Sequence, residues 1–308
     1  MSDAAIASSS RYAVEAMATR FELVFARAES HAARTRAIAE DALGEIVALE
    51  RRLSRFLPAS AIAAINAHAG SRPVKIDPEL FALLERCVAL SEATDGAFDI
   101  TIGPLSTLWK SLANAQGAPH APHAPRTVPT ADEVADARAR VGYRYLLLDP
   151  DCSTVCFARD GMSLDLGAAG KGYAIDRAID TLRSHGITNA LLHGGTSGIH
   201  ALGRAQDGQP WNVRWNDRVF ELSDRALSVS AVHGTMFCAN GKFYGHVVDP
   251  RTGCPTEAAA SVVVTGVRSL ECDALSTAFL VLGDKWLPQL RERFPGYCVS
   301  LASAGRAI

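Results

Sequence analysis

Apolar residues recur along the first hundred positions with two different periods, and each period predicts an element. Alternation with β-branched and aromatic residues over 11–26 predicts a strand pair or one long bent strand. Over 31–52 the apolar positions follow helical spacing, which predicts a helix packed on a core. A second helix is expected to start at Asp77-Pro78, a good capping pair, and to end before Gly96.

The second half of the chain alternates between short apolar runs and separate helical patterns. Helices are expected over 169–184, 270–282 and 285–294. Strands are expected over 144–148, 154–158, 189–193, 198–202, 211–215, 219–222, 226–230, 245–248 and 261–265. Short strands of antiparallel type with helices set apart from them predict an α+β fold and not a doubly wound sheet.

One segment, 113–130, breaks this pattern. It is rich in Ala and Pro and has few apolar anchors, so we expect a surface loop or a partly disordered insert. His120 and His123 lie within it. Because no carboxylate or cysteine stands close to them in the sequence, a solvated Pro-rich loop is favoured over a metal site.

Composition narrows the class of protein. The chain has 308 residues, 48% of them hydrophobic, which is enough for a large core. We expect a disordered N-terminus over 1–10 and one domain over 11–308. The net charge of −2 and the scattered Lys and Arg residues argue against nucleic-acid binding. Neither an apolar run of roughly 18 residues nor a signal peptide is present, so no membrane anchor and a cytoplasmic location are expected.

A glycine-rich segment at 164–180, LDLGAAGKGYAIDRAID, is the first candidate for chemistry. Its glycines allow the backbone to approach a phosphate closely, and the amides at a helix start favour an anion. The spacing fits neither a Walker loop nor a dinucleotide fingerprint. A plain turn that joins a strand to a helix is the competing interpretation.

Two further turns carry weaker signals. LLHGGTSGIHALG at 191–203 is more typical of a bulge or hairpin than of a binding loop. In YGHVVDPRTG, His246 ends a predicted strand and Asp-Pro-x-x-Gly is ordinary turn chemistry. A lone histidine beside a strand is more often structural than catalytic.

The helix that contains DALSTAFLVLG, 273–283, places two oxygen-bearing side chains one turn apart. Asp273 and Thr277 share the edge of an otherwise apolar stripe. A carboxylate and a hydroxyl in this arrangement suit Mg²⁺, which keeps some water and takes other ligands from a phosphate. In the competing interpretation, Asp273 caps the helix and Thr277 bonds back to a carbonyl.

Seven segments in order resemble the ApbE family of FAD:protein FMN transferases, which split FAD and attach FMN through a phosphoester to a threonine of a target flavoprotein. They span Met17 to Gly283: MAT at 17, RRLSRFLPASAIAAIN at 51, TDGAFDITIGPLSTLW at 94, DLGAAGKGYAID at 165, GG at 194, HVVDPRTG at 246 and DALSTAFLVLG at 273. The resemblance implies an ApbE-like, T-fold-like α+β architecture of mixed antiparallel sheets with flanking helices. Its active site is expected in a cleft between two lobes.

The resemblance also implies the roles of single residues. Mg²⁺, with Mn²⁺ as the alternative cation, would be held by the Ala168 carbonyl, Asp273 and Thr277. The FAD substrate would contact Met17, Phe56, Ala97, Phe98, Asp99, Asp165, Lys171 and the turn at His246. Lys171 is expected to neutralise the phosphates while AMP leaves. For the base that takes the proton of the acceptor hydroxyl we expect His246, because the ordinary pKa of histidine lies near working pH.

The chain departs from the family pattern at three places. Ala18 stands where the family has Gly, Thr196 where it has Asp, and Val229-Ser230-Ala231 where it has Thr-Ser-Gly. These changes bear on acceptor recognition and rate, and they leave the metal pair and the lysine intact. Hydrolysis of FAD to FMN and AMP, and FAD binding without turnover, therefore stay open as alternatives. The acceptor protein and the oligomeric state are open as well.

Overall fold

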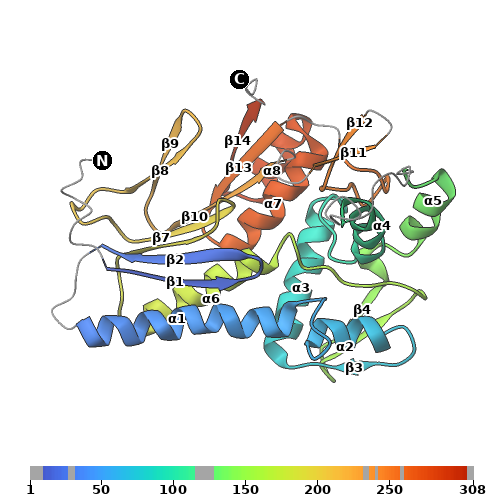
Figure 1. Cartoon of the computed structure of the whole chain (residues 1–308), viewed down its shortest axis with the longest axis horizontal. Helices are drawn as coiled ribbons and strands as arrows, with labels where there is room; N and C mark the ends of the chain where they lie inside the picture. Colours follow the sequence, from blue (N-terminus) through green and yellow to red (C-terminus); the bar gives the residue numbers. More distant parts are fainter. Residues whose placement is uncertain are drawn as a thin grey trace, which may run out of the picture.

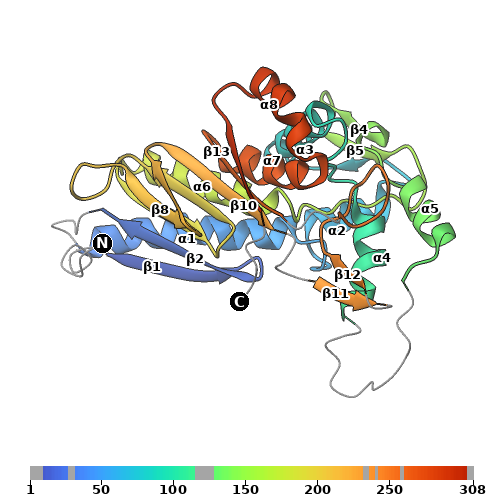
Figure 2. The same ribbon diagram turned by 90° about the horizontal axis from the view of Figure 1, so that it is seen from above.

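The chain folds into a larger lobe around one sheet and a smaller lobe of helices and short strands (Figure 1). The computed structural model describes residues 10–26, 32–114, 128–231, 236–239, 242–256 and 260–303. Figure 2 shows the sheet and the first helix at one end, with α4, α5 and the β11–β12 hairpin at the other. The predicted α+β class is confirmed. No helix among the described residues is long and apolar enough to cross a bilayer.

The larger lobe is built on a seven-stranded sheet in the order β1-β2-β6-β7-β10-β13-β14. Every neighbouring pair in it is antiparallel. Its strands are β1 (Arg11–Ala16), β2 (Thr19–Phe25), β6 (Ala190–Gly194), β7 (Gly198–Leu202), β10 (Arg225–Ala231), β13 (Ala260–Gly266) and β14 (Cys298–Ser303). The predicted strand pair over 11–26 is the β1–β2 hairpin, whose two-residue turn leaves Ala16 paired with Thr19.

One face of this sheet is covered by three helices, α1 (Ala32–Leu53), α6 (Gly170–Ser184) and α7 (Ser269–Leu282). The hairpin of β8 (Trp211–Trp215) and β9 (Arg218–Leu222) covers part of the other face. Strand alternation divides the two layers, since Ala226 packs into the helix-side core and Leu227 into the cluster under the hairpin. The serines at 228 and 230 consequently point back toward α7.

The smaller lobe and the C-terminal segments complete the molecule. Its helices are α2 (Ala61–His68), α3 (Pro78–Ala93), α4 (Gly103–Asn114), α5 (Ala131–Ala139) and the 3₁₀ turn η2 (Tyr143–Tyr145). Short sheets are formed by β3 (Val74–Lys75), β4 (Leu146–Asp149) and β5 (Thr154–Phe157), and by β11 (Met236–Ala239) and β12 (Lys242–Gly245). The turn η4 (Asp284–Trp286) and helix α8 (Leu287–Arg293) follow α7. One continuous buried cluster runs through both lobes, so they share a core.

Two predicted elements differ from the structure. The strand expected over 245–248 is wrong, because β12 ends at Gly245 and Val248 forms only an isolated bridge with Pro255. The helix expected over 285–294 is divided into η4 and α8, with Pro288 in the first turn of α8.

Two of the expectations about disorder fall mainly outside the described residues. Of the insert expected over 113–130, residues 115–127 lie outside them, including His120 and His123, whereas its first two residues close α4. The first nine residues of the expected disordered N-terminus also lie outside them.

Candidate active site

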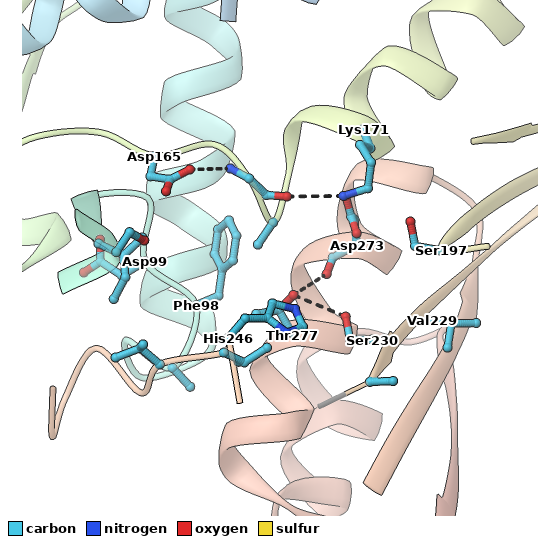
Figure 3. Close-up of a pocket in the computed structure, with 18 of the residues that line it drawn as sticks. Phe98, Asp99, Asp165, Lys171, Ser197, Val229, Ser230, His246, Asp273 and Thr277 are labelled. Carbon is cyan, nitrogen blue, oxygen red and sulfur yellow. Dashed lines mark hydrogen bonds between the residues drawn. The ribbon is translucent and has the colours of Figure 1, made fainter. Parts of the chain in front are cut away.

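The glycine-rich segment forms a tight turn between an extended strand-like stretch and α6. Asp165 anchors its start, because the Asp165 N–H donates to the Ile100 carbonyl (2.8 Å) and its Oδ1 accepts from Gly167 N–H (2.9 Å). Gly172 permits a close approach of helices, since a Cβ there would lie 2.4 Å from the Ser269 carbonyl oxygen. This glycine therefore lets the start of α6 contact the start of α7. Lys171 Nζ donates to the Gly167 carbonyl (3.4 Å), as Figure 3 shows.

Asp273 lies in the second turn of α7 and is only 6% exposed. Its carboxylate accepts hydrogen bonds from Gly172 N–H and Ser228 Oγ, each at 3.2 Å, and it forms no ion pair with the described residues. A buried carboxylate without a basic partner is costly unless a cation compensates it. Since α7 begins at Ser269, the capping role considered for Asp273 is wrong.

Thr277 follows one turn later on the same edge of α7. Its Oγ1 donates to the Asp273 carbonyl (3.2 Å), as the back-bonding interpretation predicted, and lies 3.4 Å from Ser230 Oγ. The hydroxyl lone pairs remain available to a cation. Ala168 lines the same cavity as Asp273 and Thr277. The described residues contain no cluster of three or more His, Cys, Asp or Glu side chains, and a bound cation would depend on this mixed oxygen set with phosphate or water.

The opposite wall is the segment that contains Phe98 and Asp99. Both are buried, and the Asp99 carboxylate accepts from Thr101 N–H (2.8 Å), Thr101 Oγ1 (2.7 Å) and Tyr143 N–H (2.8 Å). Burial raises the pKa of Asp99, while these hydrogen bonds act against the rise. The carboxylate therefore fixes the wall through protein donors, and the residue reaches the cavity beside the Phe98 ring (Figure 3).

A turn directly after β12 supplies the third side. His246 is exposed and lines the cavity, and Figure 3 shows it between Phe98 and the α7 residues. The expected turn chemistry is present, since Gly253 N–H donates to the Asp249 carbonyl (2.8 Å). Arg251 pairs with the Asp249 carboxylate at 3.0 Å, which further fixes the turn.

These elements enclose a cavity of about 430 Å³, with a second cavity of about 240 Å³ beside it. Asp165, Gly167 and Lys171 border both cavities. The predicted residues on the first are Ala97, Phe98, Asp99, Asp165, Ala168, Lys171, His246, Asp273 and Thr277. Met17 and Phe56 lie on the second. The structure thus brings every predicted site residue to one continuous region, bordered by elements of both lobes.

The family departures at Thr196 and at Val229-Ser230-Ala231 also lie on the first cavity. The GG segment forms the β6–β7 hairpin, as expected from its sequence, and its loop places Thr196 and Ser197 on the wall. Ser228 Oγ donates to the Ser197 carbonyl (2.9 Å), which ties this loop to β10. These two departures therefore share one wall of the first cavity, whereas Ala18 lies on the second cavity.

Trp215 and Arg55 are among the residues of the site that were not predicted. Trp215, at the end of β8, lines the first cavity with its indole Nε1 buried and without a hydrogen-bond partner among the described residues. Arg55 lines the second cavity and pairs with Asp165 at 3.2 Å. Arg55 stands inside a segment that resembles the family, next to Phe56, which was the available signal. Trp215 had no local signal, because the packing of the β8–β9 hairpin on the large sheet brings it to the site.

Taken together, the site can bind an elongated anionic ligand. A lysine and a helix start face the cavity, and oxygen ligands suited to a hard cation lie beside them. Phe98 lines the first cavity, Phe56 lines the second, and Lys171 borders both. This combination fits a ligand with ring systems joined through phosphates.

Comparison with known proteins agrees with this geometry. The ApbE family model matches residues 17–299. A relative from Treponema pallidum, named FAD:protein FMN transferase, is 33% identical, covering 90% of this chain and 82% of the relative. The crystal structure of the ApbE protein from Thermotoga maritima superposes with a TM-score of 0.82 at 27% identity, covering 96% of this chain and 97% of that one. The apo form of the flavinyl transferase ApbE from Pseudomonas stutzeri gives 0.78 at 26% identity, with 96% of each chain covered. The chain belongs to the ApbE family.

Proposed function

We propose that this chain is an FAD:protein FMN transferase that moves FMN from FAD to a threonine hydroxyl of a target flavoprotein and releases AMP. The observation that carries the proposal is the buried carboxylate of Asp273, which has no basic partner among the described residues and lies with Thr277 and Lys171 on a cavity of about 430 Å³. Family membership supports the same reaction, since the relative from Treponema pallidum bears this name.

In the proposed reaction, the threonine oxygen attacks the FMN phosphorus and forms the new P–O bond. The bond from that phosphorus to the bridging oxygen breaks, and AMP leaves with that oxygen. Lys171 neutralises negative charge that develops on the phosphates. His246 accepts the hydroxyl proton, for which its side chain is suited because histidine titrates near neutral pH.

Asp273, Thr277 and the Ala168 carbonyl are the residues proposed to hold Mg²⁺. Bound there, the cation would supply charge neutralisation at the pyrophosphate. The protein contributes the fit, because the buried Asp273 carboxylate has no basic partner among the described residues and a hydroxyl stands one turn away. Mn²⁺ prefers similar oxygen ligands and is the alternative cation.

The test combines the purified chain, FAD, Mg²⁺ and a flavoprotein domain that bears a flavinylation threonine. We expect a fluorescent covalent product and AMP in equal amounts, with neither formed after chelation of Mg²⁺. AMP release without covalent flavin, at a rate unaffected by the domain, would favour FAD hydrolysis. Tight FAD binding with no AMP release would favour a non-catalytic binding protein.

A further inference from the structure

Arg55 occupies the loop after α1, at the border of the second cavity. Its guanidinium donates to Asp165 Oδ2 (3.2 Å), to the Gly103 carbonyl (3.4 Å) and to Thr107 Oγ1 (2.8 Å). The side chains of Arg55 and Asp165 are only 13% and 9% exposed. One side chain thus connects α1, the glycine-rich turn and the start of α4.

The same guanidinium lies over the ring of Phe56, 5.0 Å from its centroid. Phe56 is 72% exposed, which is unusual for a large aromatic side chain next to a buried ion pair. With one ring face held by Arg55, the remainder of the ring stays accessible at the rim of the second cavity. A cation over the ring supplies an attraction of roughly 0.5–2 kcal/mol and restricts the ring orientation.

Asp165 continues this link toward the first cavity. Its other oxygen, Oδ1, accepts from Gly167 N–H at 2.9 Å, and the Gly167 carbonyl accepts from Lys171 Nζ at 3.4 Å. A continuous set of contacts therefore runs from the Phe56 ring through Arg55 and Asp165 to Lys171. Both ends border the second cavity, about 240 Å³ in volume.

We propose that Arg55 is a positioning residue for FAD, which preorganises Phe56 as an open platform for one ring system of FAD and fixes the turn that presents Lys171. The proposal rests on the proposed function for the identity of the ligand. Preorganisation lowers the entropic cost of binding, because the ring and the turn are already ordered in the free protein. The ring system is either isoalloxazine or adenine, both flat heterocycles that stack on an aromatic face.

The test measures dissociation constants of FAD by fluorescence quenching for the full chain with Mg²⁺ present. Arg55→Met is expected to weaken FAD binding about tenfold, the equivalent of roughly 1.4 kcal/mol. Arg52→Met is the matched control, because Arg52 lies on the same helix end and pairs with two carboxylates, Asp77 and Glu79, without bordering either cavity. We expect it to change stability and not FAD affinity.

A double-mutant cycle separates positioning from a merely structural role. If Arg55 acts through the platform, adding Arg55→Met to Phe56→Ala should weaken FAD binding by clearly less than Arg55→Met does alone. If the two losses of affinity simply multiply in the double variant, the platform role of Arg55 is overturned, and an Arg55→Met variant with native affinity overturns the whole proposal. If Arg55→Met does not fold, Arg55→Lys and Thr107→Val replace it. Arg55→Lys keeps the positive charge but loses the planar guanidinium with its several N–H donors.

Two smaller ligands show which ring uses the platform. If the platform holds isoalloxazine, Arg55→Met should weaken the binding of riboflavin. If it holds adenine, Arg55→Met should weaken the binding of AMP. A native protein that binds no FAD would refute the proposed function itself, whereas native binding with an unaffected Arg55→Met variant refutes only the role of Arg55.

Discussion

At the scale of single residues, the turn between β1 and β2 has an unusual conformation. Met17 and Ala18 are its two central residues, with φ angles of 50° and 56°, in the region that favours glycine. Such angles cost roughly 1–2 kcal/mol for a residue with a Cβ. Glu50 holds the turn, because its Oε1 accepts from Met17 N–H at 2.6 Å. Strain is thus kept at the rim of the second cavity, where Met17 and Glu50 both lie.

Ala18→Gly is expected to stabilise the protein by up to about 1 kcal/mol, since relief of the positive φ outweighs the backbone entropy that glycine loses on folding. Urea denaturation measures the change in the free energy of unfolding. Ala64→Gly is the control, because Ala64 lies in α2 with ordinary helical geometry and should cost about 0.5–1 kcal/mol. An Ala18→Gly variant destabilised as much as the control would contradict the strain argument.

Asp273→Ala is expected to abolish Mg²⁺-dependent AMP release and leave the fold intact. The Asp273 carboxylate forms no ion pair with the described residues. Its removal breaks two hydrogen bonds but also removes a buried carboxylate, and these two effects on stability oppose each other. AMP release and the melting curve, each with and without Mg²⁺, provide the measurement. Ser276→Ala is the matched control, since Ser276 is buried on the same helix and is not a predicted ligand. Undiminished turnover would remove the metal assignment.

His246→Asn is expected to retain FAD and Mg²⁺ binding and to slow transfer by roughly 10²–10⁴-fold, the usual range for a lost general base. The native rate should also fall as pH drops through the pKa of the histidine, because an imidazolium cannot accept the proton. His193→Asn in β6 is the control, since His193 borders neither cavity. His246 would be ruled out as the base if the variant kept the native transfer rate at saturating FAD. It would also be ruled out if the rate of the variant fell at low pH in the same way as the native rate.

At the scale of elements, the junction of α6 and α7 determines where the candidate metal ligands lie. Asp176 of α6 accepts from the backbone N–H groups of Ser269 (2.8 Å) and Leu270 (3.0 Å), and so caps α7 from a neighbouring helix. His200 Nδ1 lies 3.0 Å from Ser269 Oγ and 3.7 Å from Asp176. Arg268 approaches the same carboxylate at 3.4 Å. The start of α7 is therefore held by buried groups outside the cavity.

These buried groups make stability depend on pH in opposite senses. Burial lowers the pKa of His200 from 6.5 to about 4, so its stabilising contribution is complete above pH 6.5 and is lost as pH falls toward 4. Burial raises the pKa of Asp176 from 3.8 to about 6, so its contribution is complete below pH 3.8 and is lost as pH rises toward 6. In the native protein the two contributions oppose each other, so the free energy of unfolding changes with pH by less than either group alone would cause.

Single variants should separate the two contributions. Relative to His200→Gln, the native protein is expected to lose free energy of unfolding as pH falls from 6.5 to about 4, by up to about 3 kcal/mol. Relative to Asp176→Asn, it should gain free energy of unfolding as pH falls from about 6 to 4. Urea denaturation across this range measures both. A difference with the opposite slope in either variant would show that the group is charged differently in the fold.

Elements were predictable from the sequence where the signal is local. The Asp77-Pro78 capping pair predicted the start of α3 correctly. The alternation over 11–26 predicted extended structure, and of its two alternatives the strand pair is the one found. The helix α5 was missed although Thr130 and Glu133 form a capping box, because its apolar stripe is weak and only Ala137 is buried. The order of strands was not predictable, since β2 pairs with β6 across more than 160 residues of sequence.

The site was predictable only in part from physical reasoning on the residues. The spacing of Asp273 and Thr277 indicated a cation site but favoured a capping role, and the start of α7 at Ser269 excludes that role. The family resemblance named residues that the structure gathers on two adjoining cavities. Ser228 and Trp215 could not be found this way. Ser228 donates to Asp273 from strand β10, and Trp215 lines the first cavity because the β8–β9 hairpin packs on the large sheet.

At the scale of the whole molecule, the first cavity is bordered by both lobes. Phe98 and Ser106 belong to the smaller lobe, whereas Ser230 and Asp273 belong to the larger lobe. The segment with Lys171 enters α6 and contacts this cavity and the second one. A ligand that fills the cavity would therefore contact both lobes at once and oppose their separation.

FAD with Mg²⁺ is accordingly expected to stabilise both lobes, by about 2.7 kcal/mol when the free ligand reaches 100 times its dissociation constant. The melting temperature should rise, and amide exchange should slow over 97–106 and over 225–231 alike. Riboflavin lacks the pyrophosphate that Lys171 is proposed to meet, so Lys171→Met should reduce the effect of FAD and leave that of riboflavin unchanged. Lys75→Met, in β3 and bordering neither cavity, is the control. Protection confined to one lobe would place FAD outside the shared cavity, and equal losses for FAD and riboflavin in Lys171→Met would place the lysine away from the phosphates.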